Sequence, residues 1–117
     1  MIKICQFFID IIVHIGDIDS LKKELCSSFG NEKGNEVFKE MQFSDEIIGK
    51  SVELSTGALL LWVSDIKSNS VLAHEIFHTA VSIMLKRDIP LNNSTEEVCA
   101  YLIEYLTEYI QKFLSSL

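Results

Sequence analysis

The chain has 117 residues, 48% of them hydrophobic, and its 17 acidic and 10 basic residues give a formal net charge of −7. This length and composition predict one globular domain that spans residues 1–117. The acidic balance and the lack of a Lys/Arg cluster argue against binding to nucleic acid or to an anionic membrane, and the sequence contains no run of about 18 uncharged apolar residues that would predict a membrane span.

The cysteines and the N-terminal segment indicate the compartment. Cys5, Cys26 and Cys99 are odd in number and form no Cys-x-x-Cys pair, which favours free thiols in a reducing environment. The apolar segment 2–15 contains Asp10 and lacks the basic start and small-residue cleavage site of a signal peptide. We therefore expect a cytoplasmic protein.

The first half of the chain predicts strands followed by a helix. Residues 2–15 are rich in Ile, Val and Phe, which predicts one long bent strand or two short strands. A helix is expected over residues 20–29. Residues 30–35 form a turn-rich connector in this interpretation, and the segment 37–43 fits a short helix or a strand.

The second half predicts a hairpin and two helices. Residues 47–54 and 58–63 are expected to form the hairpin, followed by helices over residues 70–86 and 95–113. The expected apolar and aromatic face of the last helix consists of Val98, Tyr101, Leu102, Tyr105, Tyr109 and Phe113. This order of elements predicts the α+β class, with a small antiparallel sheet and helices on one side.

The predicted helix over residues 70–86 carries the sequence His74-Glu75-Ile76-Phe77-His78. Because helical residues are about 100° apart, His74 and His78 lie on one face, one turn apart, where two neutral imidazoles can bind one zinc ion. Glu75 lies beside them and can take a proton from an attacking water and pass it to the leaving amine. The alternative is a helix whose histidines are merely polar neighbours.

A catalytic zinc site needs a third protein ligand. Glu97 follows His78 after eighteen intervening residues, which is enough for one helix to end and for a second to begin and pack on it. Glu96 is the other candidate, and both glutamates also fit capping boxes at the start of the last helix, which need no metal. His14 is the one spare imidazole, although a partly buried structural role suits it better.

The motif His74-Glu75-Ile76-Phe77-His78 resembles the H-E-x-x-H motif of zincin metallopeptidases, and Glu97 at this spacing resembles the third ligand of the gluzincin subgroup. The whole pattern is also similar to short metallopeptidases encoded by phages and prophages. The resemblance implies Zn²⁺ held by His74, His78 and Glu97, with Glu75 as the catalytic base and no further cofactor.

The resemblance also concerns the substrate. Zincins hold a peptide antiparallel to an edge strand that precedes the motif helix, and residues 58–63 occupy that position here. Tyr101 follows Glu97 by one helical turn, so it either hydrogen-bonds to a ligand from outside the metal sphere or packs in the core. The group that stabilises the oxyanion stays open among Tyr101, Tyr105 and His14.

The leading hypothesis is therefore a zinc metallopeptidase, a hydrolase (protease) that acts on a peptide or protein substrate. The alternative is a non-catalytic protein in which zinc holds two helices together, such as a phage-encoded binder of a host or virion protein. A third hypothesis is an α+β interaction domain without a metal. The sequence leaves open the substrate, the choice between internal and terminal cleavage, and the oligomeric state.

Overall fold

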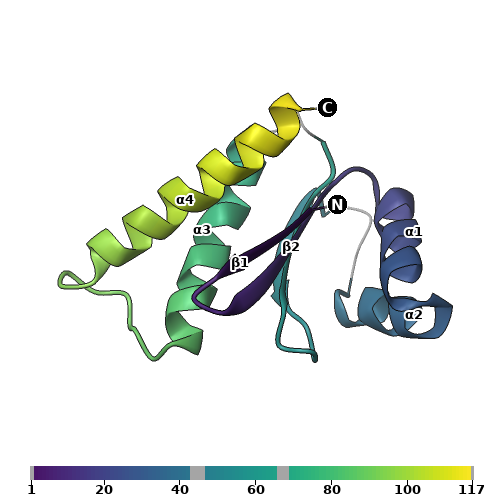
Figure 1. Ribbon diagram of the computed structural model, residues 1–117, viewed down its shortest axis with the longest axis horizontal. Coiled ribbons are helices and arrows are strands. Elements are labelled where there is room, and N and C mark those ends of the chain that lie inside the picture. The colour runs from purple at the N-terminus through teal and green to yellow at the C-terminus, as the bar shows by residue number, and fades with distance from the viewer. Residues whose placement is uncertain (1, 43–46, 66–68, 117) are drawn as a thin grey trace.

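The computed structural model describes residues 2–42, 47–65 and 69–116. The elements follow in the order β1 (Ile2–Gln6), β2 (Ile9–Ile15), α1 (Ile18–Phe29), α2 (Asn31–Glu40), β3 (Gly49–Glu53), β4 (Leu59–Val63), α3 (Asn69–Lys86) and α4 (Glu96–Ser115). Within the described residues the strands form one sheet in the order β1-β2-β4-β3. Helices α3 and α4 lie on one side of it, and α1 and α2 lie on the other (Figure 1). The predicted α+β class is confirmed.

The sheet is mixed rather than antiparallel. β1 with β2 and β3 with β4 form antiparallel pairs, but β2 and β4 pair in parallel, from Ile11 opposite Leu59 to Ile15 opposite Val63. A parallel pair needs a long crossover connection, and here α1, α2 and β3 supply it. The expectation of an antiparallel sheet with helices on one side is therefore wrong, because these helices cover the second face.

β4 is an interior strand. It lies between β2 and β3, and all five of its residues are buried. A continuous apolar run is typical of a strand that is covered on both faces. The expectation that residues 58–63 offer a free edge to a peptide is therefore wrong, and the edge strand that precedes α3 is β3.

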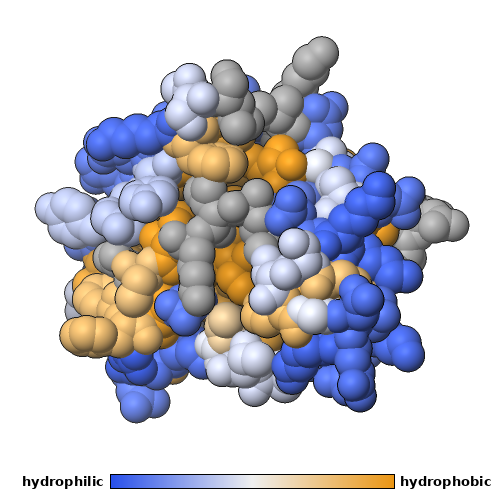
Figure 2. Space-filling view, turned by 45° about the vertical axis from the view of Figure 1, so that its right-hand side comes forward, coloured by the Kyte–Doolittle hydropathy of each residue, from blue (hydrophilic) through white to orange (hydrophobic). Residues whose placement is uncertain are grey.

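Alternate residues of the interior strands pack on opposite sides of the sheet. Ile11, Val13, Leu59 and Leu61 pack toward α3 and α4, whereas Ile12, Leu60 and Trp62 pack toward α1 and α2. In the space-filling view, hydrophobic residues gather in the middle and to one side of the face, between hydrophilic residues (Figure 2). The sheet thus separates two apolar layers.

Residues 31–35 belong to α2, and Gly30 alone separates it from α1, so the expectation of a connector over residues 30–35 is wrong. A Cβ at Gly34 would lie 2.5 Å from the Cα of Cys26, so the missing side chain allows α2 to touch α1. The segment 37–43, for which helix and strand were both open, is helical as far as Glu40. Its last residue lies outside the described residues.

The segment 2–15 forms two strands, joined by a turn in which Phe7 and Phe8 have φ angles of 52° and 61°. Two central residues with positive φ match the right-handed twist of a two-residue hairpin. The guanidinium group of Arg87, just after α3, donates two hydrogen bonds to the carbonyl oxygen of Phe7, at 2.9 and 2.6 Å. The end of α3 is thereby connected to the first hairpin.

The buried face of α4 differs from the predicted aromatic face. The buried residues are Cys99, Leu102, Leu106 and Ile110, whereas Tyr101 is 66% exposed and Tyr105 and Tyr109 are also exposed. The tyrosines are four residues apart and form a neighbouring stripe, where their hydroxyl groups reach water. Neither α4 nor any other helix of the described residues has the length and apolarity needed to cross a membrane.

Candidate metal centre

Helix α3 begins at Asn69 and ends at Lys86, one residue longer than expected. Its buried residues are Leu72, Glu75, Ile76, Thr79, Ala80, Ile83 and Met84. His74 and His78 lie on a different face and are exposed. The helix therefore buries the carboxylate of the motif and presents both imidazoles at the surface.

The imidazoles of His74 and His78 converge. Their Nε2 atoms lie 3.1 Å apart, and their ring centroids are 4.6 Å apart with an interplanar angle of 73°. Two nitrogens bound to one tetrahedral zinc ion at about 2.0–2.1 Å would lie about 3.3 Å from each other. The observed separation fits that requirement. It also suits an N–H···N hydrogen bond, so the imidazole that donates would have to carry its proton on Nδ1 for both Nε2 atoms to bind a metal.

Glu75 is only 7% exposed. A Cβ on Gly49 of β3 would lie 3.3 Å from its Oε2 atom, so the carboxylate lies against this strand. One turn later, the hydroxyl of Thr79 donates to the backbone carbonyl of Glu75 at 2.9 Å. The side chain of Glu75 is thus enclosed between α3 and the edge strand, one residue from the first imidazole.

A groove runs between α3 and β3. Two adjacent open pockets of about 360 and 380 Å³ share His74, Glu75, Ile47 and Gly49 in their walls. His78 lines the second pocket only. Pockets that bind small ligands usually begin at about 300 Å³, so the groove is large enough to hold part of a peptide beside the three motif residues.

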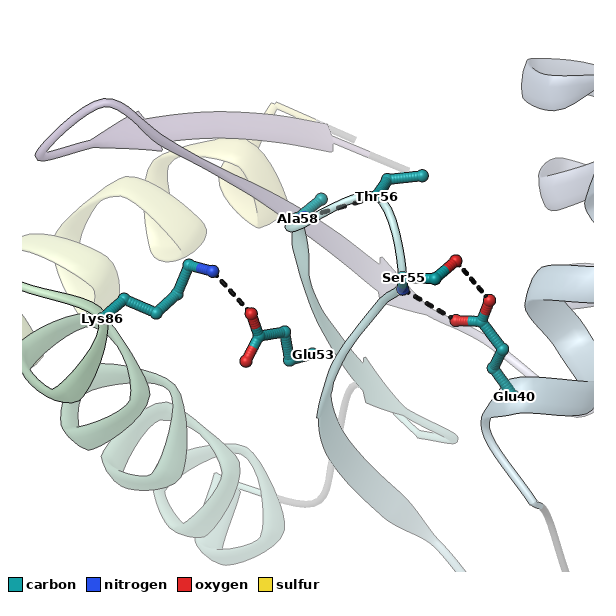
Figure 3. A network of polar contacts seen from close by, with 6 residues as sticks. All are labelled: Glu40, Glu53, Ser55, Thr56, Ala58 and Lys86. Carbon is teal, nitrogen blue, oxygen red and sulfur yellow. Dashed lines mark hydrogen bonds and ion pairs between the residues drawn. The ribbon is translucent and has the colours of Figure 1, made fainter.

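Polar contacts hold the far end of β3 to both helical layers (Figure 3). Glu53 Oε1 lies 2.5 Å from Lys86 Nζ at the end of α3. Glu40 of α2 accepts hydrogen bonds from the hydroxyl and the backbone N–H of Ser55, at 2.6 and 3.0 Å. These bonds from Ser55 hold the pKa of Glu40 below its usual value. The edge strand is therefore fixed relative to α3.

The third ligand does not join the two histidines here. Glu96 and Glu97 are exposed in the first turn of α4. Across residues 2–42, 47–65 and 69–116, no three His, Cys, Asp or Glu side chains are grouped to hold a metal ion. The N-cap residue is Thr95 and its side chain makes no capping hydrogen bond, so neither proposed capping box forms. Glu97 as a zinc ligand stays a prediction.

His14 lies on the other face of the sheet. It stands opposite Trp62 in the β2–β4 register, and its Nε2 atom is 2.9 Å from the hydroxyl oxygen of Ser20 in α1. The sheet separates it from α3, so its proposed roles as a spare ligand or oxyanion group at this site are wrong. Tyr101 is largely exposed, so it is not the core aromatic that the sequence suggested.

Comparisons with protein-family models, curated proteins and solved structures give no match. The functional interpretation therefore depends on the geometry of α3 and β3.

Gly49, Ser51 and Thr79 join the edge strand to the motif helix, and no sequence motif assigns them a role. One signal was present, because a glycine inside a strand often marks the close approach of another group. The hydroxyl pair Ser51–Thr79, with its oxygens 2.9 Å apart, leaves no comparable local signal. The two residues are 28 positions apart and meet only through the packing of α3 on the sheet.

Proposed function

We propose that this protein is a zinc-dependent metallopeptidase whose site lies between α3 and the edge strand β3. The observation that carries the proposal is the 3.1 Å separation of the Nε2 atoms of His74 and His78. A buried carboxylate at Glu75 accompanies them in an open groove. Zinc-dependent hydrolysis uses convergent imidazoles as metal donors and a nearby carboxylate as the base.

The residues of the chain have distinct tasks in this proposal. His74 and His78 supply two neutral nitrogen donors, and Glu97 is the proposed third ligand. Zinc, when bound, polarises the scissile carbonyl group and makes water a better nucleophile at neutral pH. The carboxylate of Glu75 accepts a proton from the attacking water and returns it to the leaving nitrogen. Its enclosure beside β3 holds this carboxylate at the groove that both histidines line.

The proposed substrate is an extended segment of a peptide or protein. β3 pairs with β4 along one side, and no other strand of the described residues pairs with its second side; that side is the proposed place for strand addition. A peptide paired with β3 would run along the groove that contains His74 and Glu75. The specificity of cleavage would then depend on the side chains that line this groove, among them Ile47 and Val71.

The proposed compartment is the cytoplasm, or that of a host cell if the gene belongs to a phage. Its support is the state of the cysteines, because Cys5, Cys26 and Cys99 are free thiols. Free thiols persist in reducing compartments.

Replacement of Glu75 by Gln tests the catalytic proposal. The amide keeps the size of the side chain but cannot accept the proton, so peptide hydrolysis should fall by about 10²- to 10⁴-fold. Zinc affinity should stay close to wild type, because both imidazoles remain. Cleavage of a broad peptide library, read by mass spectrometry, and zinc titration calorimetry provide the two measurements. Glu104→Gln, at an exposed position of α4, is the matched control and should change neither.

The alternative function gives a different result. If the wild-type protein binds zinc with His74 and His78 but cleaves no peptide in the library, the zinc-stabilised interaction protein replaces the peptidase. If the wild-type protein binds no zinc, both of these functions are excluded. Only the interaction domain without a metal would then remain.

A further inference from the structure

Gly49 occupies a crowded position at the start of β3. A Cβ built there would lie 2.6 Å from Cγ1 of Val71 and 3.2 and 3.3 Å from Cγ and Oε2 of Glu75. The first distance is far below van der Waals contact, and the other two are tighter than most. Gly49 is not among the residues with positive φ, so its backbone conformation is open to any residue. Glycine is therefore required here because there is no room for a side chain, and not because of its backbone angles.

Gly49 belongs to a series of contacts between β3 and α3. Gly49, Ser51 and Glu53 point to the same side of the strand and meet Glu75, Thr79 and Lys86, respectively. Two strand residues span about 6.6–6.8 Å, and four helical residues rise about 6 Å. The first two contacts therefore match in spacing, and they fix how far the helix can slide along the strand at Glu75.

The second contact has a defined direction. The hydroxyl of Thr79 has one proton, which it donates to the carbonyl oxygen of Glu75 at 2.9 Å. The hydroxyl of Ser51 must therefore donate to Thr79. This chain of two hydrogen bonds holds the backbone of Glu75 at a fixed height above β3. The direction of its side chain is left to the contact with Gly49.

We propose that Gly49 is a positioning residue, whose missing side chain leaves the space in which the carboxylate of Glu75 lies, at the groove that His74 and His78 also line. The chemical purpose of this space rests on the proposed peptidase function. The contact itself does not, and it can be tested in the metal-free protein. The residue acts through Glu75 and makes no contact with the reacting atoms.

A double-mutant cycle tests the contact first. Gly49→Ala should lower the midpoint of urea unfolding of the metal-free protein. Glu75→Ala removes both atoms of Glu75 that the new methyl group would meet. The loss of stability caused by Gly49→Ala should therefore be smaller in the Glu75→Ala background than in wild type. Equal losses in both backgrounds would overturn the proposal, whether or not the protein hydrolyses peptides.

The second measurement separates position from packing. Gly49→Ala should retain zinc affinity, because the atoms nearest to the new methyl group belong to Val71 and Glu75 and not to an imidazole, while kcat/KM falls by about 10²-fold through displacement of Glu75. Val71→Ala removes the atom nearest to the new methyl group. The double variant Gly49→Ala/Val71→Ala should regain stability but not kcat/KM. Recovery of both would assign Gly49 a packing role only and would overturn the proposal.

Gly34→Ala is the matched control. Its new Cβ would meet the backbone of Cys26 in α1 at 2.5 Å, on the opposite side of the sheet from α3. This variant should lose stability but keep kcat/KM and zinc affinity when measured well below its unfolding midpoint. A comparable loss of kcat/KM would show that general destabilisation explains the effect at Gly49, and would overturn the proposal. A wild-type protein without zinc binding would refute the peptidase function, and the cycle in urea would still decide the contact.

Discussion

The three histidines of the chain lie in two opposite environments. His14 is 5% exposed and lies between the sheet and α1, whereas His74 and His78 are exposed on α3 beyond the other face of the sheet. His14 is held by the core around it. His74 and His78 contact each other and are accessible to a ligand. Burial therefore separates a structural histidine from two candidate metal ligands in the same small domain.

The surroundings of His14 disfavour its charged form. The hydroxyl of Ser20 donates to the carbonyl oxygen of Asp17 at 2.9 Å, so the Nε2–H of His14 must donate to Ser20. Among the described residues, its Nδ1 atom is buried without a hydrogen-bond partner. A proton on Nδ1 would therefore be buried without an acceptor. Burial accordingly lowers the pKa of His14, although Glu24 and Asp17 oppose the shift.

The largest expected difference between the two environments is in zinc affinity. His74→Ala and His78→Ala should each weaken zinc binding by at least about 100-fold, because removal of a direct ligand costs more than the 10- to 100-fold typical of an outer contact. His14→Ala should leave zinc affinity unchanged. Titration calorimetry of the three variants at one pH gives the comparison. Unchanged affinity in either α3 variant would remove the proposed site.

The same titration identifies the third ligand. Glu97→Gln should weaken zinc binding as the histidine variants do, and Glu96→Gln should not. If only Glu96→Gln weakened zinc binding, Glu96 and not Glu97 would be the third ligand.

For the stability of the fold, the order of the expected effects is reversed, and the His14 variant should lose more than the His74 variant. His14→Ala should lower the free energy of unfolding by about 2 kcal/mol, since it leaves a cavity against Trp62 and removes the bond to Ser20. His74→Ala, at an exposed position, should change it by less than about 0.5 kcal/mol. Urea unfolding of the metal-free variants measures both. A larger loss for His74→Ala than for His14→Ala would contradict the assigned environments.

The convergence of His74 and His78 was predictable because it is local. A spacing of four residues places two side chains together on any helix, and the apolar residues around the motif predicted that helix well. The position of Glu97 is not local. It depends on how α4 packs on α3, and the predicted face shared only Leu102 with the buried residues of α4, which also include Leu106 and Ile110.

Strand order was the other feature that local patterns could not provide. The hairpin of β3 and β4 followed from its sequence, but the choice of edge strand depended on the parallel pairing of β4 with β2. That pairing joins residues about 48 positions apart, such as Ile11 and Leu59. The run Leu59–Val63 did contain a signal, because a strand without polar residues is typical of the interior.

The smallest expected effect is the pH dependence that His14 adds to stability. Its pKa in the folded protein lies below its ordinary value of 6.5, so the unfolded chain binds this proton more readily. The contribution of neutral His14 to the free energy of unfolding is fully present above pH 6.5, and it is lost as the pH falls from there toward the lower pKa of the folded protein. Urea unfolding between pH 5 and 8 should therefore show a steeper decline for wild type than for His14→Phe, which cannot titrate.

Glu40 provides a control for the pH range in which His14 should affect stability. The bonds from Ser55 lower its pKa below the ordinary value of 4.5, so its contribution is present above pH 4.5 and is lost only as the pH falls through the folded pKa. Glu40→Gln should therefore match the wild-type slope between pH 5 and 8 and differ only in more acidic solution. If His14→Phe and wild type had equal slopes above pH 5, His14 would bind its proton equally well in both states. The buried Nδ1 would then need an acceptor, and the contrast between the two faces of the sheet would be weaker than the packing indicates.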